Sequence, residues 1–214
     1  MKNFIDINEV PWLLNVKSNL IEAALEDLSD FFLKLPPEQK TKYNKIQQTD
    51  FIKMYAVPIY FDQKVHCPCS GSNNELFNFT VDGPEQNYEG GNGIKAKEID
   101  EIVGPLFPSQ DKSLFRKTTN LFPDQLRTGW VFFYKNGALV EEKDGHGHTT
   151  IMIHFLLEDI EGNFVVHVNG EEKILNKKGD YCIFNGIHPH GANFLGKEAK
   201  FLTFAANIQD FELI

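Results

Sequence analysis

Six of the seven histidines lie between positions 146 and 190 of the 214-residue chain. Histidine is the commonest metal ligand and the side chain that titrates nearest neutral pH. Within His146-Gly147-His148, the two imidazoles are two residues apart, so an extended backbone presents both on one face to a single ion. His154 has the same parity and is expected to point the same way. The spacing predicts a metal centre with His146 and His148 as candidate ligands.

A second candidate group comes further along the chain. Gly179-Asp180 opens a segment that ends in His188-Pro189-His190, which predicts a turn, a strand and another turn that delivers His190. Lys200 opens the last strong strand, and a buried lysine there would need an anion, such as a carboxylate of a small ligand. These residues have simpler interpretations that stay open. His146, His148 and His190 can be solvated turn residues, and Lys200 can face solvent.

The remaining histidines give weaker signals. His154 lies on an apolar strand and is either a satisfied core histidine or a ligand or substrate contact. His167 and His188 are interpreted as structural. His66-Cys67-Pro68-Cys69 could bind zinc, but the sequence has only three cysteines and no second cysteine pair to complete four ligands. We interpret that segment as an ordinary part of a Gly-rich loop over 66–93.

Composition and charge exclude several classes of function. The formal net charge of −9 disfavours non-specific nucleic-acid binding. No apolar run approaches the roughly 20 residues of a membrane span, and the first residues lack the apolar core of a secretory signal. Three cysteines argue against a disulfide framework. We therefore expect a cytoplasmic protein with no nucleic-acid or membrane partner.

Hydrophobic periodicity places the elements that must position the site. Apolar residues at spacings of three and four predict a helix over 10–35, and Pro36-Pro37 ends it. Residues 51–61 are expected to be extended. After about Gly129, short segments rich in β-branched and aromatic residues predict strands separated by turn signals, as in a sandwich or barrel. These segments are 130–134, 150–157, 164–168, 180–184 and 200–204.

From about Trp130 to Ile208 the sequence resembles the double-stranded β-helix metalloenzymes. One resemblance is to iron(II)- and 2-oxoglutarate-dependent oxygenases, of the prolyl-hydroxylase-like and aspartyl/asparaginyl-hydroxylase-like groups. It is carried by the turn 134–137, the His-x-His pair, the Gly179-Asp180 strand, His190 and Lys200. It implies an α+β fold: a jelly-roll, cupin-like barrel over 116–214 with a helical and loop elaboration over 1–115 packed on it, in one structural domain.

The same resemblance implies roles for these residues. His146 and His190 would bind Fe(II), and Lys200 would pair with the far carboxylate of the co-substrate 2-oxoglutarate. His148 stands where that family has a carboxylate, so it is either a third neutral ligand or not a ligand. An alignment to the aspartyl-hydroxylase branch instead makes His154 the first ligand, which brings it into the cofactor site.

A second resemblance is to the cupins, including three-histidine dioxygenases such as the thiol dioxygenases. His146-x-His148-Thr149 is similar to their first motif, and Gly179-Asp180 through His190 and Asn193 is similar to their second. Met152 stands where their glutamate is usual. The expected function is an iron(II)- and 2-oxoglutarate-dependent dioxygenase. The alternatives are a three-histidine cupin dioxygenase without 2-oxoglutarate, or a non-catalytic cupin-like binding protein.

The expected partners follow from these functions. They are a small-molecule or peptide-side-chain substrate and molecular oxygen, with a homodimer as an open alternative. The identity of the substrate is not encoded in any motif that we recognise.

Overall fold

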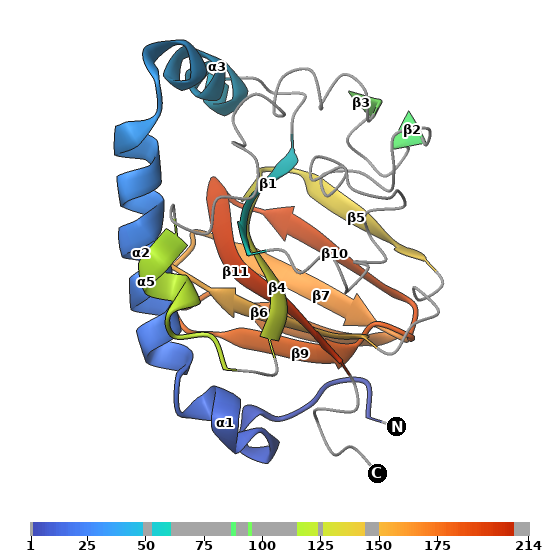
Figure 1. Ribbon diagram of the computed structural model, residues 1–214. Coiled ribbons are helices and arrows are strands. Elements are labelled where there is room, and N and C mark those ends of the chain that lie inside the picture. Colours follow the sequence, from blue (N-terminus) through green and yellow to red (C-terminus); the bar gives the residue numbers. More distant parts are fainter. Residues whose placement is uncertain are drawn as a thin grey trace.

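The fold consists of two facing antiparallel sheets with helices on one side (Figure 1). The computed structural model describes residues 2–48, 53–60, 87–88, 94–95, 115–123, 126–143 and 150–207. The helical elements are η1 (Ile7–Glu9), α1 (Pro11–Leu14), α2 (Lys17–Lys34), α3 (Pro37–Gln48) and α5 (Arg116–Thr119). The strands are β1 (Met54–Tyr60), β2 (Asn87–Tyr88), β3 (Ile94–Lys95), β4 (Leu126–Lys135), β5 (Ala138–Lys143), β6 (Thr150–Leu156), β7 (Asn163–Val168), β8 (Glu171–Leu175), β9 (Tyr181–Asn185), β10 (His190–Leu195) and β11 (Glu198–Asn207).

The strands from β4 to β11 form one long hairpin that is folded back on itself. β7 pairs with β8, β6 with β9, β5 with β10 and β4 with β11, all antiparallel. The innermost connection is Asn169-Gly170, whose φ angles of 49° and 81° are both positive. Two positive φ values at the centre of a two-residue loop are typical of a type I′ hairpin turn, which glycine and asparagine tolerate best.

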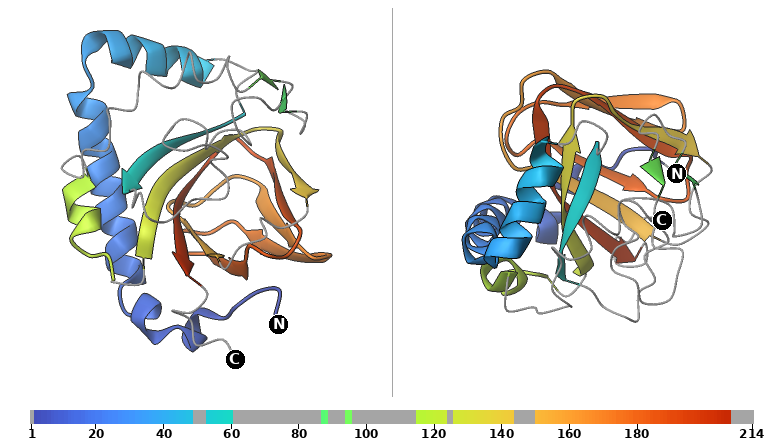
Figure 2. Two further views of the ribbon diagram at one scale, coloured as in Figure 1. Left: turned by 45° about the vertical axis from the view of Figure 1, so that its right-hand side comes forward. Right: turned by 90° about the horizontal axis from the view of Figure 1, so that it is seen from above.

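Lateral pairing then collects these strands into two sheets. One sheet has the order β1-β4-β11-β6-β9 and the other has the order β5-β10-β7-β8. Nested pairs divided between two sheets in this way make a double-stranded β-helix, or jelly roll. The view in Figure 2 shows the two sheets curving around a common interior, with α2 outside the five-stranded sheet. The α+β fold predicted from the sequence is therefore confirmed.

Strand parity divides the core into two clusters. The interior cluster lies between the sheets and includes Trp130, Met152, Phe184 and Phe201. The helix-facing cluster lies on the opposite face of the five-stranded sheet, where Phe133, Ile153 and Leu202 pack with α2. Because successive residues of a strand point to opposite faces, a residue's register decides which cluster it joins.

The helical region differs in detail from the prediction. The single helix expected over 10–35 is split into α1 and α2, with Asn15 and Val16 between them. α2 buries one stripe against the sheet and ends before Pro36, because proline disfavours helical conformation in the residue that precedes it. The extended segment expected over 51–61 is confirmed as β1, which joins the edge of the five-stranded sheet beside β4.

Five strands were not predicted from the sequence: the short pair β2 and β3, of which β2 lies within the loop expected over 66–93, and the strands β5, β8 and β10. β5 and β8 are the edges of the four-stranded sheet and carry several charged residues, so their composition is that of solvated hairpins. β10 contains Gly191 and Asn193 and was interpreted as part of a turn region. Each of them is a strand because a neighbouring strand supplies its hydrogen bonds, which is a tertiary effect that local propensity does not contain.

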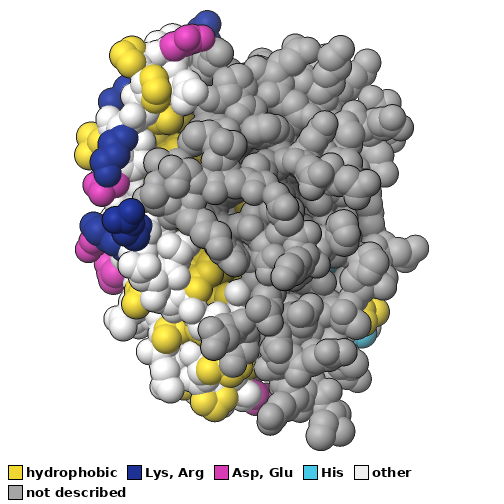
Figure 3. All heavy atoms as spheres, viewed as in Figure 1, with side chains coloured by type: hydrophobic (Ala, Val, Ile, Leu, Met, Phe, Trp, Pro, Cys, Tyr) yellow, Lys and Arg dark blue, Asp and Glu magenta, His cyan; other side chains and the backbone are white. Residues whose placement is uncertain are grey.

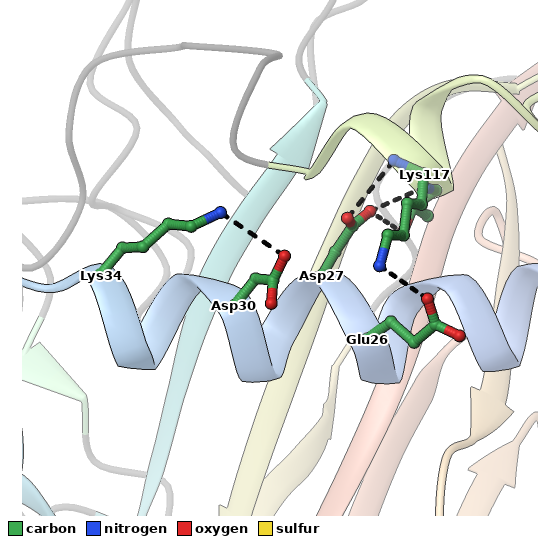
Figure 4. Close-up of polar contacts among 6 residues, drawn as sticks. Glu26, Asp27, Asp30, Lys34 and Lys117 are labelled. Atoms are coloured by element: carbon green, nitrogen blue, oxygen red, sulfur yellow. Dashed lines mark hydrogen bonds and ion pairs between the residues drawn. The ribbon is translucent and has the colours of Figure 1, made fainter.

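Asp27 on α2 holds α5 in place and is the one charged residue that is buried within the described part of the chain (Figure 4). Its carboxylate accepts hydrogen bonds from the Thr118 backbone N–H at 2.7 Å and the Thr118 hydroxyl at 2.8 Å. The Lys117 N–H donates to the same carboxylate at 3.3 Å. A carboxylate that accepts three hydrogen bonds compensates its own desolvation and ties the two helices together.

The outer surface of α2 carries charges of both signs. Figure 3 shows dark blue and magenta side chains alternating along this edge of the molecule. The ion pairs here include Lys34–Asp30 at 3.5 Å and Lys117–Glu26 at 2.7 Å. None of the helices among the described residues combines the length and the apolar character needed to cross a membrane.

Replacing Asp27 with alanine is expected to lower the free energy of unfolding by about 2–3 kcal/mol, because hydrogen bonds to a charged group are lost and buried donors stay unsatisfied. Urea denaturation measures the effect. The matched control is Asp30→Ala on the same helix, which removes only an exposed pair and should change stability by less than about 0.5 kcal/mol. Equal effects of the two substitutions would contradict the anchoring role of Asp27.

Candidate metal and ligand site

The turn before β10 is rigidly held and sets the position of His190. The Asn185 side-chain oxygen accepts a hydrogen bond from the Ile187 N–H at 3.0 Å, and the His188 N–H donates to the Asn185 carbonyl at 3.1 Å. On the other side, the Asn169 N–H donates to the Pro189 carbonyl at 2.8 Å. The turn is thereby joined both to the end of β9 and to the β7–β8 connection, which limits the freedom of the residue that opens β10.

The hydrogen bond of His190 identifies its tautomer. Nδ1 of His190 lies 2.8 Å from the backbone carbonyl oxygen of His188. A carbonyl oxygen only accepts hydrogen bonds, so Nδ1 carries the proton and the lone pair of the neutral ring is on Nε2. Metal-binding histidines in proteins usually have this arrangement, in which one ring N–H donates to a carbonyl or carboxylate and the other nitrogen is the ligand.

His154 lies on the inward face of β6 with its ring among apolar residues. Its Nδ1 is 2.9 Å from the hydroxyl of Thr203, which stands opposite it on β11. Its ring stacks on Phe184, with centroids 5.7 Å apart, and meets the edge of Phe201 at 6.4 Å. Thr203 is fully buried, and the His154 residue itself keeps a small accessible area.

Phe184 joins the two inward-facing histidines. Its ring centroid is 4.9 Å from that of His190 and 5.7 Å from that of His154. Burial, together with the smaller effect of the nearby His190, lowers the pKa of His154 to about 3. His154 is therefore neutral across the physiological pH range, because desolvation and a neighbouring positive charge both disfavour its charged form.

The other two described histidines have different surroundings. His188 has a buried Nε2 atom without a hydrogen-bond partner, and its carbonyl orients His190. His167 faces outward from β7, and its Nδ1 lies 3.3 Å from Glu172 on β8. Neither imidazole is joined to the His154–Phe184–His190 group by a contact that the structure describes.

Lys200 lies on the other face of the five-stranded sheet from His154. It stands opposite Phe133, a member of the helix-facing cluster. Its Nζ contacts Glu158 at 2.9 Å and Glu198 at 3.4 Å. Burial lowers the pKa of Lys200, but the hydrogen bonds and charges of these two carboxylates outweigh burial and hold the pKa above its usual value. The structure does not bring Lys200 together with the histidines, and its charge is balanced within the protein.

His146 and His148 lie in the segment 144–149, which is outside the described residues. The same is true of His66, Cys67 and Cys69. Within the described part of the chain, no group of three or more His, Cys, Asp or Glu side chains could hold a metal ion. The imidazoles that the structure places near each other are those of His190 and His154, and further ligands would have to come from outside the described residues, where His146 and His148 are the candidates.

Comparisons with known proteins were made with both sequence and structure. No protein-family model matches the chain, and no curated protein matches it. Among solved structures, KdgF from a Halomonas species is similar with a TM-score of 0.30 and 20% identity, over 37% of this chain and 68% of that one. The DMSP lyase DddQ from Ruegeria pomeroyi is similar with a TM-score of 0.32 and 20% identity, over 40% of each chain. The cupin domain of Cnp3 from Schizosaccharomyces pombe is similar with a TM-score of 0.33 and 22% identity, over 40% of this chain and 59% of that one.

Identities below 25% and TM-scores near 0.3 carry no argument about function. The chain spans less than two thirds of the length of two of these three structures. The fold assignment therefore depends on the strand order itself, and the activity has to be argued from the site.

Sequence reasoning found His154 and His190 but not their partners. Thr203 and Phe184 were not singled out, although strand parity contained a signal for both. Thr203 is the one polar residue in the apolar run Phe201–Ala206, and Phe184 is two residues from Cys182 on the same face. Recognising them needed the cross-strand register, which local sequence does not supply.

The depressed pKa of His154 has a consequence for stability at low pH. An exposed imidazole takes up a proton near its usual pKa of 6.5, but the folded His154 does so only at about 3. Between these values the unfolded chain binds more protons, so the stabilisation is complete above 6.5 and is lost as the pH falls toward 3. We expect the His154 ring nitrogens to show neutral-imidazole chemical shifts by NMR from about pH 8 to about pH 5. Protonation of His154 within that range would contradict the assignment of a dry environment.

Proposed function

We propose that the protein is a three-histidine, cupin-type dioxygenase that binds one iron(II) ion through His190, His146 and His148 and does not use 2-oxoglutarate. The observation that carries the proposal is the pairing of His190 with Lys143, the last residue of β5. The segment with His146 and His148 begins directly after Lys143.

Chain connectivity supports this ligand set. The segment 144–149 leaves the four-stranded sheet at Lys143 and enters the five-stranded sheet at Thr150. The segment 186–189 makes the same change of sheet between Asn185 and His190, and Ile151 pairs with Asn185. The two segments that cross between the sheets, 144–149 and 186–189, therefore both connect the β5–β10 pair to the β6–β9 pair. Since one residue spans at most about 3.6 Å, His146 is within roughly 11 Å of Lys143 along the backbone.

The donor chemistry of His190 also suits a metal. Its Nδ1–H is used by the His188 carbonyl, so the coordinating nitrogen would be Nε2, and the ring orientation is already set. Imidazole ligands suit iron, and also zinc, copper and nickel. Three protein ligands around an octahedral ion leave positions for substrate and oxygen, which is the arrangement that a dioxygenase needs.

The version of this function with 2-oxoglutarate has less support. That function would need Lys200 to bind the far carboxylate of 2-oxoglutarate. The Lys200 side chain instead lies on the helix-facing side of the five-stranded sheet, between Glu158 and Glu198. The residues of β11 that share the inward face with Thr203 are Ala199, Phe201 and Ala205, and none of them is a cation. A dicarboxylate in that part of the interior would be left without a counter-charge.

The residues around the site have roles that follow from their contacts. When bound, the metal would supply Lewis-acid and redox chemistry. The His188 carbonyl keeps the His190 ring in one tautomer and one orientation. Phe184 and Phe201 line the interior beside His154 and exclude water from it. Exclusion of water protects reactive species and strengthens polar interactions with the substrate.

The substitution His190→Ala is expected to lower the affinity for iron(II) by more than about 100-fold, because even loss of a partner outside the ligand set commonly costs 10- to 100-fold. Anaerobic titration of metal-free protein, followed by elemental analysis, measures it. The matched control is His167→Ala, which removes an outward-facing imidazole from β7, the strand next to β10, and should leave metal affinity unchanged. Equal iron affinity of wild type and His190→Ala would refute the site.

A second titration separates the two oxygenase mechanisms. Adding 2-oxoglutarate to the anaerobic iron complex is expected to produce no visible charge-transfer band and, after oxygen is admitted, no succinate, because the interior lacks a described anchor for the co-substrate. The substitution Lys200→Met should leave iron affinity within about twofold, since the side chain is outside the interior. A band that appears with 2-oxoglutarate and is lost in Lys200→Met would restore the 2-oxoglutarate-dependent function.

A further inference from the structure

The described contacts of the His154 ring are with Phe184, Phe201 and Thr203, and none of these residues is charged. The inward-facing residues that the structure places in the interior cluster are apolar or aromatic apart from a few polar atoms. They are Met54, Trp130, Tyr134, Ala138, Met152, His154, Leu156, Phe164, Val166, Val168, Leu175, Cys182, Phe184, Ala192, Phe194, Ala199, Phe201, Thr203 and Ala205. Lys173 of β8 shares the inward face with Leu175, and its Nζ lies 4.0 Å from the centre of the Tyr181 ring. The pairs His167–Glu172 and Lys200–Glu158 lie on the other faces of their sheets.

His154 is less completely buried than its neighbours on the same face of β6. Met152 and Leu156 share its face of β6 and are 7% and 0% exposed, but His154 between them retains a larger exposed fraction. Its Nδ1 is engaged by Thr203, and its Nε2 makes no hydrogen bond with a described residue. A polar atom of a ligand that entered beside His154 would therefore meet a ring nitrogen with unused hydrogen-bonding capacity.

The surroundings of this nitrogen favour uncharged ligands. Moving an ion from water into an apolar site is strongly unfavourable unless an opposite charge or several hydrogen bonds replace the water. An uncharged polar group needs only one good hydrogen bond, which His154 offers. Phe184, stacked on the imidazole at 5.7 Å, and Phe201, edge-on at 6.4 Å, provide apolar surface for the rest of the ligand.

We infer that His154 determines substrate specificity by binding an uncharged hydroxyl, carbonyl or amide group through Nε2, and that the surroundings of this ring disfavour carboxylates. Thr203 is the positioning residue, because its hydroxyl pairs with Nδ1 and thereby holds the angle of the ring. This inference rests on the proposed function only in naming the ligand a substrate. The binding preference itself belongs to the metal-free interior.

The test compares benzamide and benzoate, two probes of nearly the same shape that differ in charge. The benzamide group has both a donor and an acceptor, so it can pair with either tautomer of His154. Metal-free full-length protein with 15N-labelled histidine is titrated with each probe by NMR. We expect benzamide to shift the His154 resonances and to bind at least about tenfold more tightly than benzoate, a difference of about 1.4 kcal/mol.

Variants separate a role in binding from a role in folding. His154→Leu should weaken benzamide binding by at least about fivefold and should remove its preference over benzoate. Thr203→Val keeps the shape of the side chain but removes the hydroxyl, so it should change the His154 tautomer ratio and weaken the binding of benzamide. His167→Leu is the matched control, because that ring faces outward. If His154→Leu does not fold, Thr203→Val and the two probes on the wild type still decide the question.

Two kinds of result would overturn the inference. One is benzoate binding as tightly as benzamide, or neither probe shifting His154. The other is benzamide affinity that His154→Leu and Thr203→Val leave unchanged. Iron titration of His190→Ala reports separately on the proposed function. If His190→Ala leaves iron affinity unchanged but benzamide is still preferred over benzoate, only the proposed metal site is refuted. If iron binds as expected but the preference for benzamide is absent, only this inference is refuted.

Discussion

The nested antiparallel pairing around the Asn169-Gly170 turn is the constraint on which the rest of the structure depends. Because β7 pairs with β8, each outer pair must form in turn, and β5 is brought to β10 and β6 to β9. The two crossings between the sheets, 144–149 and 186–189, consequently start from neighbouring strands. A turn of positive φ, hydrogen-bonded to the segment that leads into His190, thus helps to decide which histidines can meet.

Cross-strand register then divides the polar residues between two environments. His154 and Thr203 lie on the inward face, among the aromatic rings, and Lys200 lies three residues from Thr203 on the outward face. A shift of one residue in β11 would exchange these faces. The same alternation gives the five-stranded sheet two buried faces, since α2 covers one and the four-stranded sheet covers the other. Asp27 contributes to that cover by joining α5 to α2.

The proposed chemistry depends on a contrast within this interior. His190 is at the start of β10, in a turn fixed by backbone hydrogen bonds on both sides, and its tautomer is suited to a cation. His154 lies on the adjoining sheet, and its surroundings keep it neutral. The proposals assign one imidazole to a metal and the other to an uncharged ligand, and the structure places Phe184 in contact with both rings. A jelly roll accommodates many functions, so these residues carry the functional argument and the fold does not.

The sequence alone determined the class of fold and the strands β1, β4, β6, β7, β9 and β11, because hydrophobic periodicity and turn residues are local properties. It also identified His190 and His154 as candidates. It did not determine β5, β8 or β10, whose residues are extended only because paired neighbours supply their hydrogen bonds. Tertiary structure alone decided the side of the sheet that Lys200 occupies and the pairing of His154 with Thr203. Both depend on the register between strands that lie far apart in the chain, and register is fixed by packing of whole sheets rather than by the residues at either position.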